Sequence, residues 1–141
     1  MPYPELMIRP FRDELTSAGF EELRSPEDVE QWMQSQGDDD TALLVVNSVC
    51  GCAAGMARPG VRLALENGAR PKRLGTVFAG QEVEATAAAR GYFPQVPPSS
   101  PSMALVKGGE LVYYLPRHRI EGRDMQQVAE DLSAAFDEHC A

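Results

Sequence analysis

The chain of 141 residues is long enough to enclose a hydrophobic core, and 43% hydrophobic and 24% charged residues are typical of a globular protein. Its net charge of -8 at pH 7 argues against nucleic acid and anionic membranes as partners, because both are bound through clustered Lys and Arg. The N-terminus lacks the basic and apolar regions of a signal peptide, and no run approaches a membrane span. We therefore expect a cytoplasmic protein without a membrane partner.

The first part of the chain predicts two helices. Residues 5–18 carry apolar side chains at spacings of three and four, which favours an amphipathic helix. Ser25, followed by a proline and two acidic residues, is typical of the start of a second helix. The side chains of this helix that we expect in the core are Val29, Trp32 and Met33.

The middle of the chain predicts a buried strand that leads into a helix. Residues 41–47 form a continuous apolar run, as in a strand covered on both faces. A helix should follow over residues 50–66, with a kink or break at Pro59, which lacks an N–H and crowds the preceding turn. Arg58 lies two turns along this helix, so we expect it to have little influence on the pKa of Cys50 at the helix start unless the helix bends at Pro59.

The rest of the chain predicts a strand, a helix, a proline-rich loop, a hairpin of two strands and a final helix capped by Asp124. The first five of these elements cover residues 74–79, 81–90, 94–102, 103–107 and 111–115. This order predicts an α/β fold with a central mixed β-sheet flanked by helices on both faces.

The most informative motif is Cys50-Gly51-Cys52, at the junction between the buried strand and its helix. Open α/β sheets place their sites at this edge, and a helix N-terminus stabilises a thiolate, which is the nucleophilic form of cysteine. Two other interpretations stay open at this point. The cysteines could be small buried residues, or they could join His139 and Cys140 in a metal site if the C-terminus folded back over them.

The segments around the motif resemble a known family. Residues 45–60 (VVNSVCGCAAGMARPG) and 97–105 (PPSSPSMAL) are similar to the bacilliredoxins, and the similarity extends over nearly the whole chain. The resemblance implies a thioredoxin-like fold, here one domain over residues 1–141 with an N-terminal helical extension. It also implies a thiol-disulfide oxidoreductase that removes bacillithiol, or a similar low-molecular-weight thiol, from mixed disulfides on cytosolic client proteins, with weak disulfide isomerase activity in some members.

The same resemblance assigns roles to individual residues. Cys50 matches the family's nucleophile and Cys52 its second cysteine. Pro101 matches the position of a cis-proline that faces the cysteines in thioredoxin-like proteins, so Ser100 and Pro101, together with Gly51, are the expected substrate-binding residues. The small thiol acts as co-substrate, and we expect no cofactor and no metal.

Ring size bears on the reaction cycle. A disulfide across a single intervening residue closes a smaller ring than one in Cys-x-x-Cys and should be strained and easily reduced. Exchange through Cys50 alone is therefore the expected cycle.

We expect Cys140 to be a free thiol near the chain end and His118 to lie in a solvated loop. The exposed edge of the hairpin could pair with a second copy, so a homodimer is compatible with the sequence. A metal-binding module and a noncatalytic interaction domain remain alternative functions.

Overall fold

The central element is a five-stranded sheet in the order β1-β3-β2-β4-β5. The computed structural model describes residues 3–141. Strands β1, β3 and β2 are parallel, whereas β4 runs antiparallel to β2, and β5 antiparallel to β4. The strands are β1 Glu21–Glu22, β2 Thr41–Asn47, β3 Arg73–Phe78, β4 Ser102–Lys107 and β5 Glu110–Leu115.

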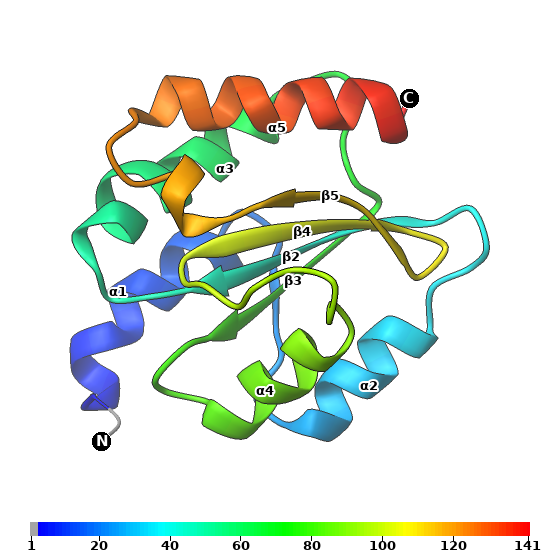
Figure 1. Cartoon of the computed structure of the whole chain (residues 1–141). Coiled ribbons are helices and arrows are strands. Elements are labelled where there is room, and N and C mark those ends of the chain that lie inside the picture. Colours follow the sequence, from blue (N-terminus) through cyan, green and yellow to red (C-terminus); the bar gives the residue numbers. More distant parts are fainter. Residues whose placement is uncertain (1–2) are drawn as a thin grey trace.

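Helices cover both faces of this sheet. Figure 1 shows α3 and α5 on one face, and α2 and α4 on the other. The predicted α/β fold with a mixed sheet is therefore confirmed. The helices are α1 Glu5–Thr16, α2 Pro26–Gln34, α3 Arg58–Ala64, α4 Val83–Gly91 and α5 Met125–His139, with the short helical segments η1 Ala53–Ala57 and η2 Arg117–Arg119.

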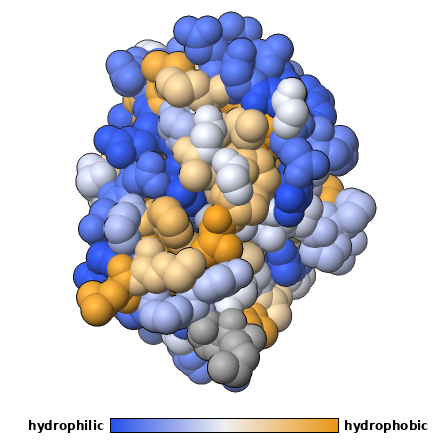
Figure 2. Space-filling view, turned by 90° about the vertical axis from the view of Figure 1, so that its left-hand side faces the viewer, coloured by the Kyte–Doolittle hydropathy of each residue, from blue (hydrophilic) through white to orange (hydrophobic). Residues whose placement is uncertain are grey.

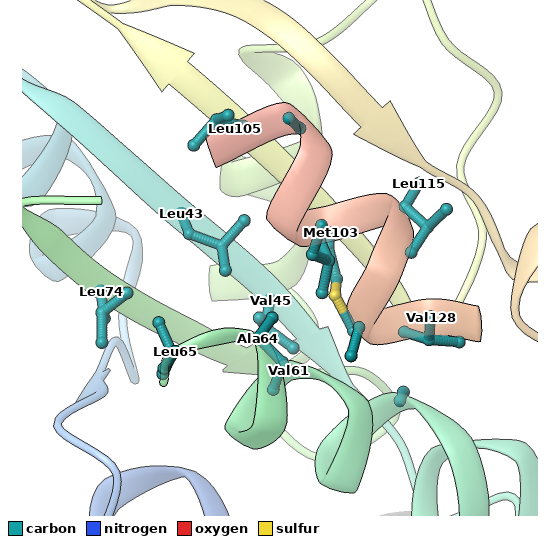
Figure 3. Packing of buried hydrophobic residues seen from close by; sticks show 14 of the residues in the cluster. Leu43, Val45, Val61, Ala64, Leu65, Leu74, Met103, Leu105, Leu115 and Val128 are labelled. Carbon is teal, nitrogen blue, oxygen red and sulfur yellow. The ribbon is translucent and has the colours of Figure 1, made fainter. Parts of the chain in front are cut away.

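The core consists of two hydrophobic clusters that share the strand β2. Leu43 and Val45 point toward α3 and α5, whereas Leu44 and Val46 point toward α2 and α4. All seven residues of β2 are buried, as the apolar run predicts. Figure 3 shows the first cluster, in which side chains of the sheet meet those of α3 and α5.

Capping residues begin two of the helices as predicted. The Ser25 side chain accepts a hydrogen bond from the Asp28 N–H, and Asp124 forms a reciprocal capping box with Gln127. Val29, Trp32 and Met33 of α2 are buried, as expected. Trp32 packs against Gly75 of β3, where an added Cβ would lie 2.7 Å from the indole ring, so the strand needs a glycine at this position.

Two features differ from the prediction. The strand β1 was not predicted, because two glutamates carry no hydrophobic pattern; its pairing with β3 is made by backbone groups alone. The helix after β2 departs from α-helical geometry over η1, which precedes Pro59 instead of coinciding with it. Pro59 offers no N–H to the Gly55 carbonyl, and the Arg58 N–H donates to Ala53, one residue further back than in an α-helix.

Between Tyr3 and Ala141, no helix combines the length and the apolar composition that crossing a membrane requires.

Candidate functional site

The Cys50-Gly51-Cys52 motif lies at the carboxyl end of β2, where the parallel strands stop. The backbone N–H groups of Ala53 and Ala54 donate to the Cys50 carbonyl oxygen at 3.1 and 3.2 Å, so Cys50 begins the first helical turn. Cys50 is partly exposed, and Cys52 is only 7% exposed. The strand-to-helix junction predicted from the sequence is therefore present. At this junction the Cys50 thiol is partly exposed to solvent, and the Cys52 thiol is buried.

Hydrogen bonds favour the thiolate of Cys50. Burial alone would oppose its ionisation, but the Cys52 thiol, the Ser48 hydroxyl and the backbone N–H groups of Ala53 and Cys52 together outweigh burial. The pKa of Cys50 consequently lies below its ordinary value. The Ser48 Oγ also accepts the Cys50 backbone N–H at 3.2 Å, which fixes the hydroxyl beside the sulfur.

The pKa of Cys52 moves in the opposite direction. Burial raises it, and so do the hydrogen bond that its thiol donates to Cys50 and the charge of the Cys50 thiolate. Arg117 acts to lower this pKa, and Glu121 acts to raise it. The two thiols thus differ in pKa: Cys50 is the one more easily ionised and better suited to act as a nucleophile, and Cys52 donates a hydrogen bond to it.

Arg58 holds the backbone that leads into the motif. It is 1% exposed, and its Nη1 donates to the Ser48 carbonyl at 2.8 Å and to Asn47 Oδ1 at 3.0 Å. Asn47 Oδ1 in turn accepts the Ser48 N–H at 2.9 Å. Arg58 Nε pairs with Glu14 of α1 at 2.6 Å. Arg58 is not one of the groups that chiefly shift the Cys50 pKa, so the expectation of little influence on that pKa is not contradicted; what the sequence did not predict is its contact with the backbone at the end of β2.

The loop before β4 forms the next part of the site. The Ser100–Pro101 peptide bond is cis, as expected. Ser102 pairs with Val46, one residue before the end of β2, so the cis bond lies close to the strand end that leads to Cys50. Pro101 is buried and Ser100 half-buried, and Arg117 Nη1 donates to the Ser100 carbonyl at 3.2 Å. Binding of a substrate by Ser100 and Pro101 remains a prediction.

Arg117 is the residue that the sequence did not single out. It opens η2, its backbone N–H donates to Ser99 Oγ at 3.1 Å, and its charge acts on both Cys50 and Cys52. Its guanidinium also pairs with Glu121 at 2.8 Å. Position 117 lies far along the chain from the cysteines, so only the pairing of β5 with β4 and of β4 with β2 brings it to them. His118 beside it is exposed, as expected.

Open space lies beside Gly51, the middle residue of the motif. Gly51 is exposed, and a Cβ added there would meet nothing within 4 Å. Figure 2 looks onto the end of the molecule where β2 and β3 stop, and it shows a band of hydrophobic residues between hydrophilic flanks. Packing therefore does not require glycine at position 51, and the exposed face beside Cys50 is free for an incoming group.

Arg117 also lines a groove of about 370 Å³. It is lined by Pro97, Pro98 and Ser99 of the proline-rich loop and by Pro116, Arg117, His118 and Glu121. A second cavity, of about 290 Å³, lies under the same loop on the α4 face of the sheet. Its mainly apolar lining, which includes Leu44, Val46 and Phe93, contains none of the cysteines.

The structure separates the four residues of the alternative metal site. The Cys140 thiol hydrogen-bonds Thr41 at the start of β2, whereas Cys50 follows the other end of that strand. Within residues 3–141, no three His, Cys, Asp or Glu side chains are grouped as metal ligands would be. The C-terminus does not fold over the Cys50-Cys52 pair, which was the condition for that site.

The fold and the thiol pair together define the class of protein. Solved structures of thioredoxins share this fold: that of Fasciola hepatica aligns with a TM-score of 0.59 at 16% identity over 85% of this chain and 99% of its own. Chlamydomonas reinhardtii thioredoxin f2 aligns with a TM-score of 0.56 at 14% identity over 86% and 96%. The protein is a thioredoxin-like α/β protein with two thiols at the carboxyl edge of its sheet.

Sequence relatives narrow this class to one family. A family model described as disulphide isomerase matches residues 3–140. Bacilliredoxin BH1716 of Halalkalibacterium halodurans is 52% identical over 98% of this chain and 94% of its own length. A bacilliredoxin of Cytophaga hutchinsonii is 51% identical over 96% and 98%. The chain belongs to the bacilliredoxin family, as its motifs predict, and is a redox protein of the oxidoreductase class.

Proposed function

We propose that this protein removes a low-molecular-weight thiol, bacillithiol in cells that make it, from mixed disulfides on cytoplasmic client proteins. The observation that carries the proposal is the asymmetric thiol pair: a partly exposed Cys50 with a lowered pKa, beside a buried Cys52 that donates to it. Nucleophilic exchange needs an accessible thiolate; Cys50 is partly exposed, and its lowered pKa favours the thiolate form.

The first step transfers the small thiol to the protein. The Cys50 thiolate attacks the sulfur of the small thiol in the mixed disulfide, a new S–S bond forms on Cys50, and the old S–S bond breaks. The client sulfur leaves as a thiolate and takes a proton from solvent. The client is thereby reduced, and Cys50 carries the adduct.

The second step releases the small thiol. A second molecule of that thiol attacks the adduct as a thiolate, which restores the Cys50 thiolate and yields the symmetric disulfide of the small thiol. Cys52 could attack instead and leave a Cys50–Cys52 disulfide, which an external thiol must then reduce. The Cys50 charge is absent from the adduct, but burial, the largest cause of the raised Cys52 pKa, persists there and disfavours this branch, so exchange through Cys50 alone is the proposed cycle, without a cofactor.

Mass spectrometry of the protein after mixing with a bacillithiolated client tests the proposal. Wild type, Cys50→Ser and Cys52→Ser are compared, and the series is repeated with a glutathionylated client. We expect an adduct on Cys50 in wild type and in Cys52→Ser, and none in Cys50→Ser. Transfer that persists in Cys50→Ser, or is absent from wild type with both clients, would overturn the proposal. Cys140, which is present in all three proteins, serves as an internal control.

A further inference from the structure

The groove between residues 97–99 and η2 contains an arginine, Arg117, whose charge acts on both thiols. Arg117 lines this groove together with Glu121, and its Nη1 contacts the Ser100 carbonyl beside the cis bond to Pro101, close to the strand end that leads to Cys50. Two contacts fix its position: its backbone N–H donates to Ser99 Oγ, and its Nη1 donates to the Ser100 carbonyl.

From this arrangement we infer that the groove between residues 97–99 and η2 holds the carboxylate-bearing part of the low-molecular-weight thiol, with Arg117 as its anion-binding side chain. The inference rests on the proposed thiol exchange and names the substrate class of that same site. A guanidinium fixed by backbone contacts presents its remaining N–H groups in a planar array that suits carboxylates. The groove volume of about 370 Å³ is in the range of small-ligand sites.

Glu121 forms an ion pair with Arg117. Both Nε and Nη2 of Arg117 donate to one oxygen of this carboxylate, at 3.1 and 2.8 Å. The two side chains are 42% and 58% exposed, and ion pairs this exposed contribute little to stability. A substrate carboxylate can therefore displace Glu121 at small cost, and Glu121 acts as a competitor that weakens binding.

Binding of a substrate carboxylate by Arg117 must be distinguished from a purely electrostatic effect of Arg117 on Cys52. We therefore compare two probes on the same client: a glutathione mixed disulfide, which brings two carboxylates, and a 2-mercaptoethanol mixed disulfide, which brings none. The variants are Arg117→Gln, Glu121→Gln and, as matched control, Arg119→Gln. Arg119 is a second cation of η2 that pairs with Asp131 and does not line the groove.

Arg117→Gln should lower the second-order rate of transfer about tenfold more with the glutathione adduct than with the mercaptoethanol adduct, as expected for losing one charge-assisted hydrogen bond to a carboxylate, because any effect on the thiols themselves is common to both probes. Glu121→Gln should raise the glutathione rate, up to about fivefold. Arg119→Gln should change neither rate. An equal loss of rate with both probes in Arg117→Gln would overturn the inference, because it would mean that Arg117 acts on the thiols and not on a substrate carboxylate. Absence of transfer from both probes in wild type would instead contradict the proposed exchange itself.

Discussion

At the scale of single residues, the reactivity of Cys50 depends on the hydrogen bonds that Ser48 and Cys52 donate to its sulfur. The Ser48 hydroxyl both donates to the Cys50 sulfur and accepts the Cys50 N–H. A hydrogen bond to the charged form of an acid lowers its pKa, because it stabilises the product of ionisation. The hydroxyl is therefore one of the groups that lower the pKa of Cys50.

Ser48→Ala should raise the pKa of Cys50 and move the pH profile of its alkylation to higher pH. Below the pKa the rate follows the thiolate fraction, so alkylation by iodoacetamide at pH 7 should slow; well above the pKa the rates should converge. Peptide mapping after timed alkylation measures the rate at Cys50 alone. Ser17→Ala, at an exposed serine after α1, is the control. Profiles that coincide for wild type and Ser48→Ala would contradict this role.

Arg58 positions Ser48 through the Ser48 backbone carbonyl, whereas the Ser48 side chain contacts Cys50. Its guanidinium is buried, lies 4.6 Å from the centre of the Phe11 ring and donates to Glu14, Asn47 and the Ser48 carbonyl. A lysine retains the charge and loses the planar set of donors, so the Ser48 turn would lose at least one contact.

Arg58→Lys should lower the free energy of unfolding by about 1–3 kcal/mol, because buried acceptors are left unpaired. It should also slow alkylation of Cys50 at pH 7, which a purely structural role elsewhere would not do. Denaturant unfolding and timed alkylation give the two readouts. Arg62→Lys, on the exposed side of the same helix, should change neither. Loss of stability with an unchanged alkylation rate would separate Arg58 from the site.

At the scale of elements, the site depends on how closely α3 approaches α5. Gly60 is the contact point: an added Cβ would lie 2.7 Å from Val128 Cγ1 and 2.9 Å from its Cβ. Valine is stiff at χ1, so the clash cannot be relieved by a side-chain rotation alone. Gly55, in the wide turn η1, has nothing within 4 Å of the same position.

Gly60→Ala should lower the free energy of unfolding by about 1–3 kcal/mol, the usual cost of overpacking. Gly55→Ala should leave it unchanged or raise it by up to about 1 kcal/mol, because alanine restricts the unfolded chain more than glycine does. Midpoints of thermal or urea unfolding, measured side by side, test the pair. Equal effects of the two substitutions would mean that helix propensity, and not the α3–α5 contact, decides.

The elements also explain how far the sequence alone could lead. The buried run of β2 and the caps at Ser25 and Asp124 each reflect a local rule, and all three were predicted. Arg117 and the contacts of Arg58 were not, because their partners belong to other elements and only the sheet order brings them together. A two-residue strand such as β1 has no pattern of its own to recognise.

At the scale of the whole molecule, β2 couples the two faces of the sheet. Its alternate residues enter both hydrophobic clusters, so neither cluster can lose its packing without disturbing the strand that supports the other. Trp32, the only tryptophan, lies in the α2–α4 cluster and reports on that face. Leu132 of α5 is fully buried in the opposite cluster.

Leu132→Ala should lower the free energy of unfolding by about 2–5 kcal/mol, through lost burial and a residual cavity. If residues 1–141 fold as one domain, the midpoint read from Trp32 fluorescence should shift as far as the midpoint read from helical circular dichroism, although the substitution is on the other face. Val29→Ala, in the cluster of Trp32, gives the reference shift for a substitution on the reporter's own face. A fluorescence midpoint that stays at its wild-type value in Leu132→Ala, while the dichroism midpoint falls, would mean that the two faces unfold separately. In that case the sheet edge that carries Cys50 could lose its α3–α5 support while the α2–α4 face remained folded.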